Sequence, residues 1–187
     1  STIAHGTIKN MSIAKAKNAP GVLDVIYYQN CPPVPGYNPY AKDPAKKGYE
    51  WWGLKVFADN KVVSNGQPIA MVIADTIERA VHAASLVKTT YTAEPFDADF
   101  EKLKTDNSKL KNMNNYKRGD ADVYKNAEFF VEGEFTVPYE THNPMELQAT
   151  IAVWDGDDKL TVYDKSQGPK STQSALAGCF NLDQKNV

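Results

Sequence analysis

Residues 139–154, YETHNPMELQATIAVW, place several reactive side chains just ahead of an apolar run. Glu140, His142 and Glu146 could bind a metal ion or transfer a proton. The stretch therefore allows four interpretations: a metal cluster, an acid/base pair, a capped turn, or one wall of a larger site.

The spacing of these residues argues against a metal ion held by the protein alone. None of the three histidines has a second His or Cys three or four positions away, which is the spacing typical of zinc sites. His142 and Glu146 could pair, but Pro138 and Pro144 prevent one helix from presenting both side chains together. No metal-ligating residues are therefore predicted.

Other catalytic signatures are missing from the sequence. No Gly-x-Ser-x-Gly elbow surrounds Ser171 or Ser174, so a serine nucleophile has no support. No Gly-x-Gly-x-x-Gly or phosphate-binding loop occurs either. Glu140 and Glu146 could act as paired carboxylates, but any chain contains such pairs. The remaining interpretations of residues 139–154 stay open at this point.

Local patterns predict the elements of the first half. The clearest is a helix over residues 76–88, capped by Asp75, because apolar residues recur there at helical spacing. Residues 68–74 form an unbroken apolar run, which predicts a strand covered on both faces. Asn65-Gly66 is typical of a hairpin turn. Further predicted elements are strands at 6–11, 22–28 and 89–95 and a helix at 12–18 capped by Ser12.

The second half has a β pattern. Residues 127–138 alternate between apolar and polar side chains, which predicts a strand. Residues 148–167 predict a hairpin that turns at 155–158. A short helix follows over 169–180. We therefore expect a domain boundary near residue 126, with an α/β unit before it and a β-rich domain after it.

Charge and cysteine content limit the class of protein. The net charge of −2 gives no basic field that would bind nucleic acid or an anionic membrane. No apolar run approaches the roughly 18 residues of a membrane helix. Cys31 and Cys179 lie far apart and are interpreted as two reduced thiols.

Longer blocks of the sequence occur in a characteristic order. They are AHGTIKNMSIAKAKNAPGVLDVI, NGQPIAMVIADTIERAVHAASLVKTTYTAEP, THNPMELQATIAVW and LTVYDKSQGPKSTQSALAGCFNLDQKNV. In this order they resemble the molybdenum-binding subunit of the xanthine dehydrogenase/aldehyde oxidase family. The blocks with the highest specificity are Gly66-Gln67-Pro68 and residues 142–146 with Gln167 downstream, and the latter looks closest to bacterial members.

The resemblance implies an α+β fold. Residues 1–126 would be the family's α/β hammerhead domain, truncated at its N-terminus. Residues 127–187 would be the incomplete beginning of the first molybdopterin-binding domain. We expect the chain to be a piece of a longer subunit, in which a Gly-Gly-Gly-Phe-Gly loop follows Val187 and the catalytic glutamate lies far toward the C-terminus. No catalytic residue is expected within the 187 residues.

The resemblance also implies chemistry for the parent protein. Molybdenum hydroxylases oxidise aldehydes or N-heterocycles with oxygen from water, using a molybdopterin-type molybdenum cofactor. Iron–sulfur clusters and FAD on other domains or subunits carry the electrons away. The implied partners are the rest of the molybdenum subunit, the iron–sulfur and flavin subunits or domains, and a small-molecule substrate. The chain alone should be inactive and bind no cofactor, and the parent should be cytoplasmic or exported folded to the periplasm.

One residue carries over from the family, and two more are interpreted as supporting it. Gln167 follows the predicted strand KLTVYD, where family members place a glutamine beside the molybdenum, and a neutral amide can donate there without becoming a ligand. The alternative is that Gln167 caps the helix starting at Pro169. His142 and Glu146 would shape the turn into the first strand of the cofactor domain and support the site from outside, with Glu146 buried and hydrogen-bonded.

The competing function belongs to a different class. A stand-alone binding or assembly module could keep the hammerhead fold without catalysis. Its binding face would be residues 30–60, which are rich in Pro, Tyr and Trp.

Overall fold

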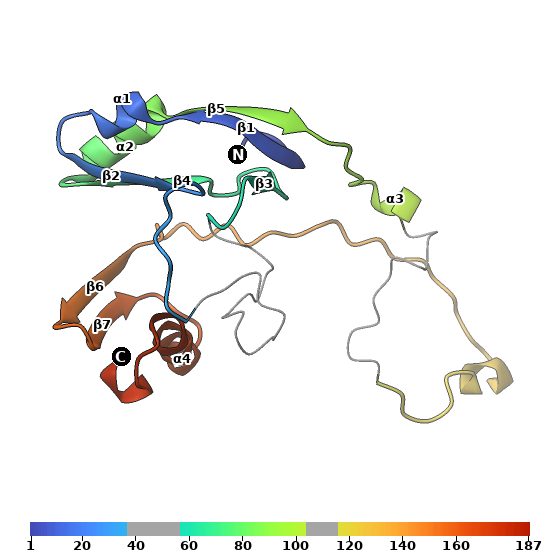
Figure 1. Ribbon diagram of the computed structural model, residues 1–187. Coiled ribbons are helices and arrows are strands. Elements are labelled where there is room, and N and C mark those ends of the chain that lie inside the picture. The colour runs from blue at the N-terminus through green and yellow to red at the C-terminus, as the bar shows by residue number, and fades with distance from the viewer. Residues whose placement is uncertain (37–56, 104–115) are drawn as a thin grey trace. The chain divides into compact units, whose positions relative to one another are not determined.

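The computed structural model of the protein describes residues 1–36, 57–103 and 116–187. The chain divides into two compact units, one made of Ser1–Phe96 with Gln148–Val187 and the other of Asp97–Leu147. The first unit holds all the strands of the described residues (Figure 1). The second holds the short helices α3 (Phe100–Leu103) and η3 (Val123–Asn126). Most of the predicted binding face at 30–60 lies outside the described residues.

Two small antiparallel sheets organise residues 1–96. In the first sheet, β1 lies between β3 and β5, and in the second β2 pairs with β4. Helix α1 follows β1, and helix α2 follows β4 and leads directly into β5. The bounds are β1 (Gly6–Ser12), α1 (Ala14–Lys17), β2 (Val22–Tyr27), β3 (Lys61–Val62), β4 (Ala70–Ala74), α2 (Ile77–Leu86) and β5 (Lys88–Ala93).

Small side chains make the core between these elements. Ala16 of α1, Val25 of β2 and Ala83 of α2 are fully buried and belong to one cluster. An alanine lets a helix backbone approach its neighbour closely, and close packing is needed for full dispersion contact. The predicted strands at 6–11, 22–28 and 89–95 and the helix at 76–88 are confirmed within a few residues at their ends.

Strand β4 departs from the sequence prediction. Ala70, Val72 and Ala74 are half-buried, whereas Met71 is 46% and Ile73 37% exposed. The prediction that residues 68–74 are covered on both faces is therefore wrong for the described structure. Since β4 pairs with β2 in a two-stranded sheet, only its inner face packs against α2. An apolar run does not reveal whether one or both faces will be covered.

The helix caps also differ by one residue from the predictions. Thr76, rather than Asp75, is the N-cap of α2, and its hydroxyl accepts a hydrogen bond from the Arg79 amide at 3.3 Å. Asp75 instead pairs with the Arg79 guanidinium. Ser12 ends strand β1, and the residue before α1 is Ile13, which makes no side-chain cap.

The predicted hairpin around Asn65-Gly66 is wrong, and the Gln67 side chain makes some of the hydrogen bonds that a hairpin would have made. The turn itself is present, since Gly66 has φ +78°, a conformation that favours glycine. However, β3 pairs with β1 and β4 with β2. The Gln67 side chain accepts from the Val63 amide at 2.8 Å and donates to the Lys61 carbonyl at 3.0 Å. These bonds satisfy backbone groups that a returning strand would otherwise pair.

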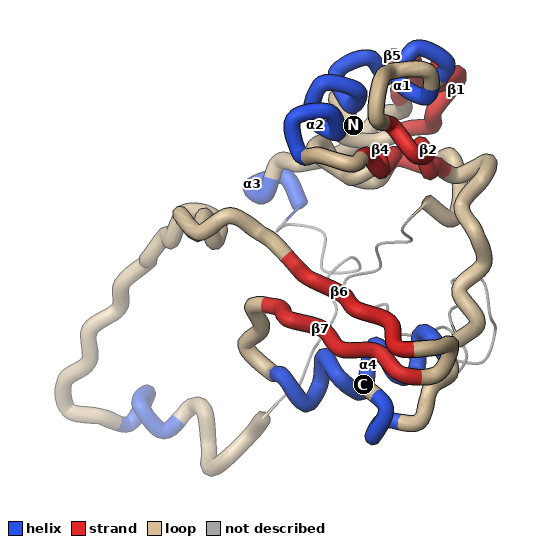
Figure 2. Tube along the Cα trace, turned by 90° about the vertical axis from the view of Figure 1, so that its left-hand side faces the viewer, coloured by secondary structure: helices blue, strands red, loops and turns tan. Residues whose placement is uncertain are grey.

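The C-terminal part confirms the predicted hairpin and helix. Strands β6 (Thr150–Asp155) and β7 (Lys159–Asp164) pair antiparallel beside α4 (Pro169–Phe180), as Figure 2 shows. Leu160 and Ala177 are buried here, and the Trp154 and Phe180 rings meet edge to face with centroids 5.3 Å apart. The turn η4 (Gln184–Asn186) follows.

The strand predicted at 127–138 is wrong for the described structure. Residues 127–149 contain no helix or strand, and Phe129, Val131 and Phe135 are 85%, 98% and 90% exposed. The alternating pattern encodes a face suited to burial, but a strand also needs a neighbour with which to exchange backbone hydrogen bonds. None of the described strands pairs with this segment.

Candidate functional site

The turn between β7 and α4 holds Gln167, the main candidate from the sequence. β7 ends at Asp164, whose carboxylate accepts from the Thr150 hydroxyl across the hairpin at 2.5 Å. α4 begins at Pro169, whose fixed φ suits the first position of a helix. Residues 165–168 therefore connect two elements whose ends are well defined.

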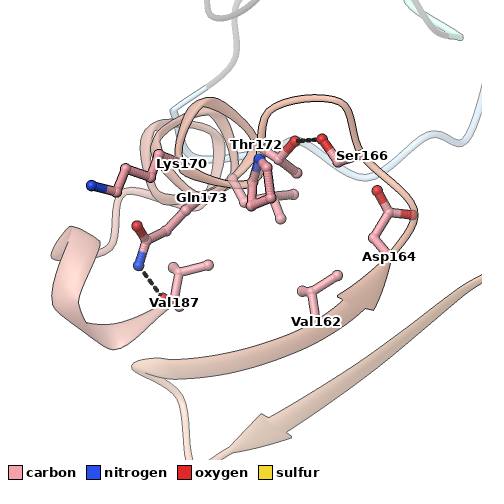
Figure 3. A pocket seen from close by; sticks show the side chains of 9 residues that line it. Val162, Asp164, Ser166, Lys170, Thr172, Gln173 and Val187 are labelled. Carbon is pink, nitrogen blue, oxygen red and sulfur yellow. Dashed lines mark hydrogen bonds between the residues drawn. The ribbon is translucent and has the colours of Figure 1, made fainter.

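Hydroxyl groups bind the turn to the first turn of α4. The oxygens of Ser166 and Thr172 lie 2.7 Å apart (Figure 3), and the Gly168 amide donates to Ser166 Oγ at 3.1 Å. On the other side, the Gly168 carbonyl accepts from Ser171 Oγ at 2.7 Å and from the Thr172 amide at 2.9 Å. The residues before and after Gln167 are thus both fixed to α4.

Gln167 itself is exposed. No hydrogen bond joins its side-chain amide to another described residue, whereas both of its neighbours are bonded. The N-cap position of α4 belongs to Gly168, and no side chain caps the helix there. The alternative in which Gln167 caps α4 is therefore wrong, and its amide is available to another group.

A cavity of about 310 Å³ lies between β7 and α4 (Figure 3). Its wall combines an acidic and a basic side chain, Asp164 and Lys170, with the hydroxyls of Ser166 and Thr172. Apolar side chains complete it, and the Gln173 amide closes one end by donating to the Val187 carbonyl at 2.6 Å. Gln167 is not among the residues that line this cavity.

His142 and Glu146 belong to the other unit, Asp97–Leu147, and the structure does not group them with Gln167. Both side chains are exposed, so the predicted burial of Glu146 is wrong for the described structure. Nearby order is local, as in the bond from the Asn143 amide to the Thr141 hydroxyl at 3.0 Å. Their supporting role stays a prediction.

Titration and metal-binding geometry single out no further site. The backbone amide and the ammonium of Lys185 hold the pKa of the Asp183 carboxyl below its ordinary value. The hydrogen bond from that backbone amide caps the start of η4. Within the described ranges, no three His, Cys, Asp or Glu side chains are arranged to hold a metal ion. No helix among the described residues is long and apolar enough to cross a bilayer.

The family model for the aldehyde oxidase and xanthine dehydrogenase a/b hammerhead domain matches residues 1–95, and the model for the molybdopterin cofactor-binding domain matches residues 103–187. The chain belongs to the aldehyde oxidase and xanthine dehydrogenase family. The resemblance and the fold class predicted from the sequence are confirmed, while the boundary near residue 126 stays a prediction.

Relatives of known function are much longer than this chain. Aldehyde oxidase 4 of Rattus norvegicus is 30% identical over 190 residues, which cover 100% of this chain and 13% of the relative. Xanthine dehydrogenase of Emericella nidulans is 28% identical and covers 95% of this chain and 12% of its own length. The chain therefore spans about 13% of the length of such relatives.

Solved structures share the fold at lower identity. The aldehyde oxidoreductase of Desulfovibrio gigas superposes with a TM-score of 0.71 at 23% identity, covering 100% of this chain and 22% of that one. Quinoline 2-oxidoreductase of Pseudomonas putida 86 gives a TM-score of 0.69 at 18% identity, covering 100% and 25%. These likenesses show that the fold is shared, while the order of the two domains comes from the two family models.

Proposed function

We propose that the chain is part of a molybdenum hydroxylase that oxidises an aldehyde or an N-heterocycle with oxygen from water, and that Gln167 orients the molybdenum cofactor. The observation that carries this proposal is an exposed, unbonded amide on a turn fixed at both ends, inside the segment that the molybdopterin-binding model matches. When bound, the cofactor supplies the two-electron oxidation.

The residues around Gln167 fit a group that orients the cofactor without ligating the metal. Residues 162–176 contain no Cys or His, so this segment offers no thiolate or imidazole ligand. A glutamine amide can donate two hydrogen bonds while adding no charge. Such outer contacts orient a metal centre and tune its properties.

The remaining machinery belongs to other parts of the parent protein. We assign residues 1–126 to the hammerhead module and residues 127–187 to the start of the cofactor domain, which puts the boundary inside the segment 103–187 that the molybdopterin-binding model matches. Iron–sulfur and flavin domains or subunits, the catalytic groups and most of the cofactor's walls lie outside these residues, so the 187-residue chain is inactive alone. Its unpaired thiols Cys31 and Cys179 fit the reducing cytoplasm, and folded export to the periplasm is the alternative.

The test is Gln167→Ala in the intact enzyme, with turnover expressed per bound molybdenum. A lost neutral hydrogen bond of about 1 kcal/mol or somewhat more corresponds to a roughly tenfold loss of turnover. The melting temperature should stay unchanged because the amide is exposed. Gln148→Ala, which removes another exposed glutamine, is the matched control. Full turnover per molybdenum in Gln167→Ala would remove Gln167 from the site.

A further inference from the structure

We propose that Ser166 and Thr172, hereafter the hydroxyl pair, are positioning residues for Gln167. Their mutual hydrogen bond fixes the backbone of the turn, and this directs the side-chain amide of Gln167 toward the cofactor. The inference rests on the proposed function of Gln167 and names the groups that make its amide effective.

The geometry of the pair supports this role. Both side chains are half-buried, and their oxygens lie 2.7 Å apart (Figure 3). Ser166 Oγ also accepts from the Gly168 amide at 3.1 Å. A hydroxyl has one hydrogen and two lone pairs, so Ser166 can make both bonds at once. The Ser166 hydroxyl is thereby bonded to Gly168, the residue after Gln167, and to Thr172 in α4.

Two further hydrogen bonds restrain the turn just after Gln167. The Ser171 hydroxyl and the Thr172 amide both donate to the Gly168 carbonyl, which follows Gln167 in the chain. A Cβ at Gly168 would lie 2.4 Å from Ser171 Oγ, so a larger residue there would force the Ser171 side chain to rotate. The hydroxyl of Ser166 is a side-chain anchor at the residue directly before Gln167. Losing it should free the Gln167 backbone while α4 stays formed.

Positioning and plain structural support predict different results. If the pair only stabilised α4, its loss would lower the melting temperature and leave each loaded molybdenum site normal. If it positions Gln167, its loss should change the molybdenum centre in the same direction as Gln167→Ala. A catalytic group placed slightly wrong loses much of its effect, because the productive geometry is narrow.

The first experiment uses the metal-free protein and needs no activity. Hydrogen exchange of the Gly168 amide reports directly on its bond to Ser166 Oγ. In Ser166→Ala we expect this exchange to be about fivefold faster, as expected for one lost hydrogen bond. Ser166→Thr keeps the hydroxyl and should restore slow exchange. Unchanged exchange in Ser166→Ala would overturn the proposed role.

The second experiment uses the intact holoenzyme, with all values per bound molybdenum. Ser166→Ala and Thr172→Val should lower kcat roughly three- to tenfold at an unchanged KM and shift the molybdenum midpoint potential in the direction seen for Gln167→Ala. Thr172→Ser should restore both values. Ser174→Ala, which removes another hydroxyl of α4 bonded to the Lys170 carbonyl at 3.0 Å, should leave both unchanged.

The double variant separates the two hypotheses. Ser166→Ala added to Gln167→Ala should cause no further loss, because the two residues act through one contact. An impaired Gln167→Ala beside a normal Ser166→Ala, or additive losses in the double variant, would overturn this inference and leave the function of Gln167 standing. A normal Gln167→Ala would overturn both.

Discussion

Gln67 shows at the residue scale how one side chain can replace a missing strand. Its side-chain amide accepts from the Val63 backbone amide and donates to the Lys61 carbonyl. Its backbone carbonyl accepts from the Ser1 amino group at 2.7 Å. Gln67→Glu keeps the acceptor and loses the donor. We expect the free energy of unfolding to fall by about 1 kcal/mol in chemical denaturation. Gln148→Glu, at an exposed position, serves as the control, and equal effects of the two would contradict this role.

Asp24 gives a prediction on pH. The Val25 amide at 2.8 Å and the Lys17 ammonium at 3.3 Å hold the pKa of its carboxyl below the ordinary value of 3.8. The folded protein therefore binds this proton less readily than the unfolded chain. The stabilising effect is present above about pH 4 and is lost as the pH falls through the lowered pKa.

Asp24→Asn should therefore lower the melting temperature at neutral pH. Asparagine can still accept from the Val25 amide, so the loss isolates the charge. The difference from the natural protein should shrink as the pH falls below about 4 and disappear below the lowered pKa, where the folded aspartate is neutral as well. Thermal melting between pH 7 and pH 2 measures it. A difference that stays constant over this range would contradict the assignment.

At the scale of elements, the cap of α2 provides a test of one-residue precision. Thr76 accepts from the Arg79 amide, whereas Asp75 makes an exposed ion pair with the Arg79 side chain. Thr76→Ala should cost about 1 kcal/mol of unfolding free energy, and Asp75→Ala less than about 0.5 kcal/mol. Urea unfolding of both variants measures this order. A larger loss for Asp75→Ala would show that the cap is Asp75 after all.

The segment 127–149 provides a second test at this scale. Phe129, Phe135 and Tyr139 are 85%, 90% and 92% exposed and lie outside any strand or helix. Proteases cut exposed segments with few local contacts first. In limited digestion with chymotrypsin, cleavage after these residues should precede cleavage after Tyr91 in β5. Mass spectrometry of the fragments over time gives the order of cleavage. Cleavage after Tyr91 first would contradict the exposure of this segment.

Local periodicity explains which elements could be predicted from the sequence. Helix α2, helix α4 and the β6–β7 hairpin depend on contacts within a short stretch, so pattern and turn residues suffice. The pairings of β1 with β3 and β5 join distant residues, and nothing in a local pattern specifies them. Residues 127–138 carry a strand pattern without a described partner strand, which is why the prediction failed there.

The candidate site likewise contains residues that the sequence could indicate and residues that only the folded structure brings together. Gln167 was predicted from the family resemblance and stays a prediction, since a glutamine after a strand has no distinctive chemistry of its own. Ser166 and Thr172 were missed because hydroxyl residues near a helix start are common. Only the turn between β7 and α4 brings their oxygens within 2.7 Å. A serine two residues before the N-cap glycine, together with a threonine in the first turn, is the signal that could have indicated the pair.

At the scale of the whole molecule, the proposed function makes the chain one wall of a larger site. It covers about 13% of an aldehyde oxidase relative. Binding free energy for a large cofactor comes from many contacts, and the proposal places most of them outside these residues. The isolated 187 residues should therefore bind neither molybdopterin nor molybdate in calorimetry. Tight, saturable binding of either compound would contradict this division of the site.

The molybdenum content of the full natural product of the gene that encodes these 187 residues tests the central claim most directly. The purified protein should be a polypeptide several times longer than this chain, and elemental analysis should find about one molybdenum per polypeptide, accompanied by a pterin. A product that ends close to Val187, folds, and contains no molybdenum when expressed with the cofactor available would contradict the assignment and favour the stand-alone binding module.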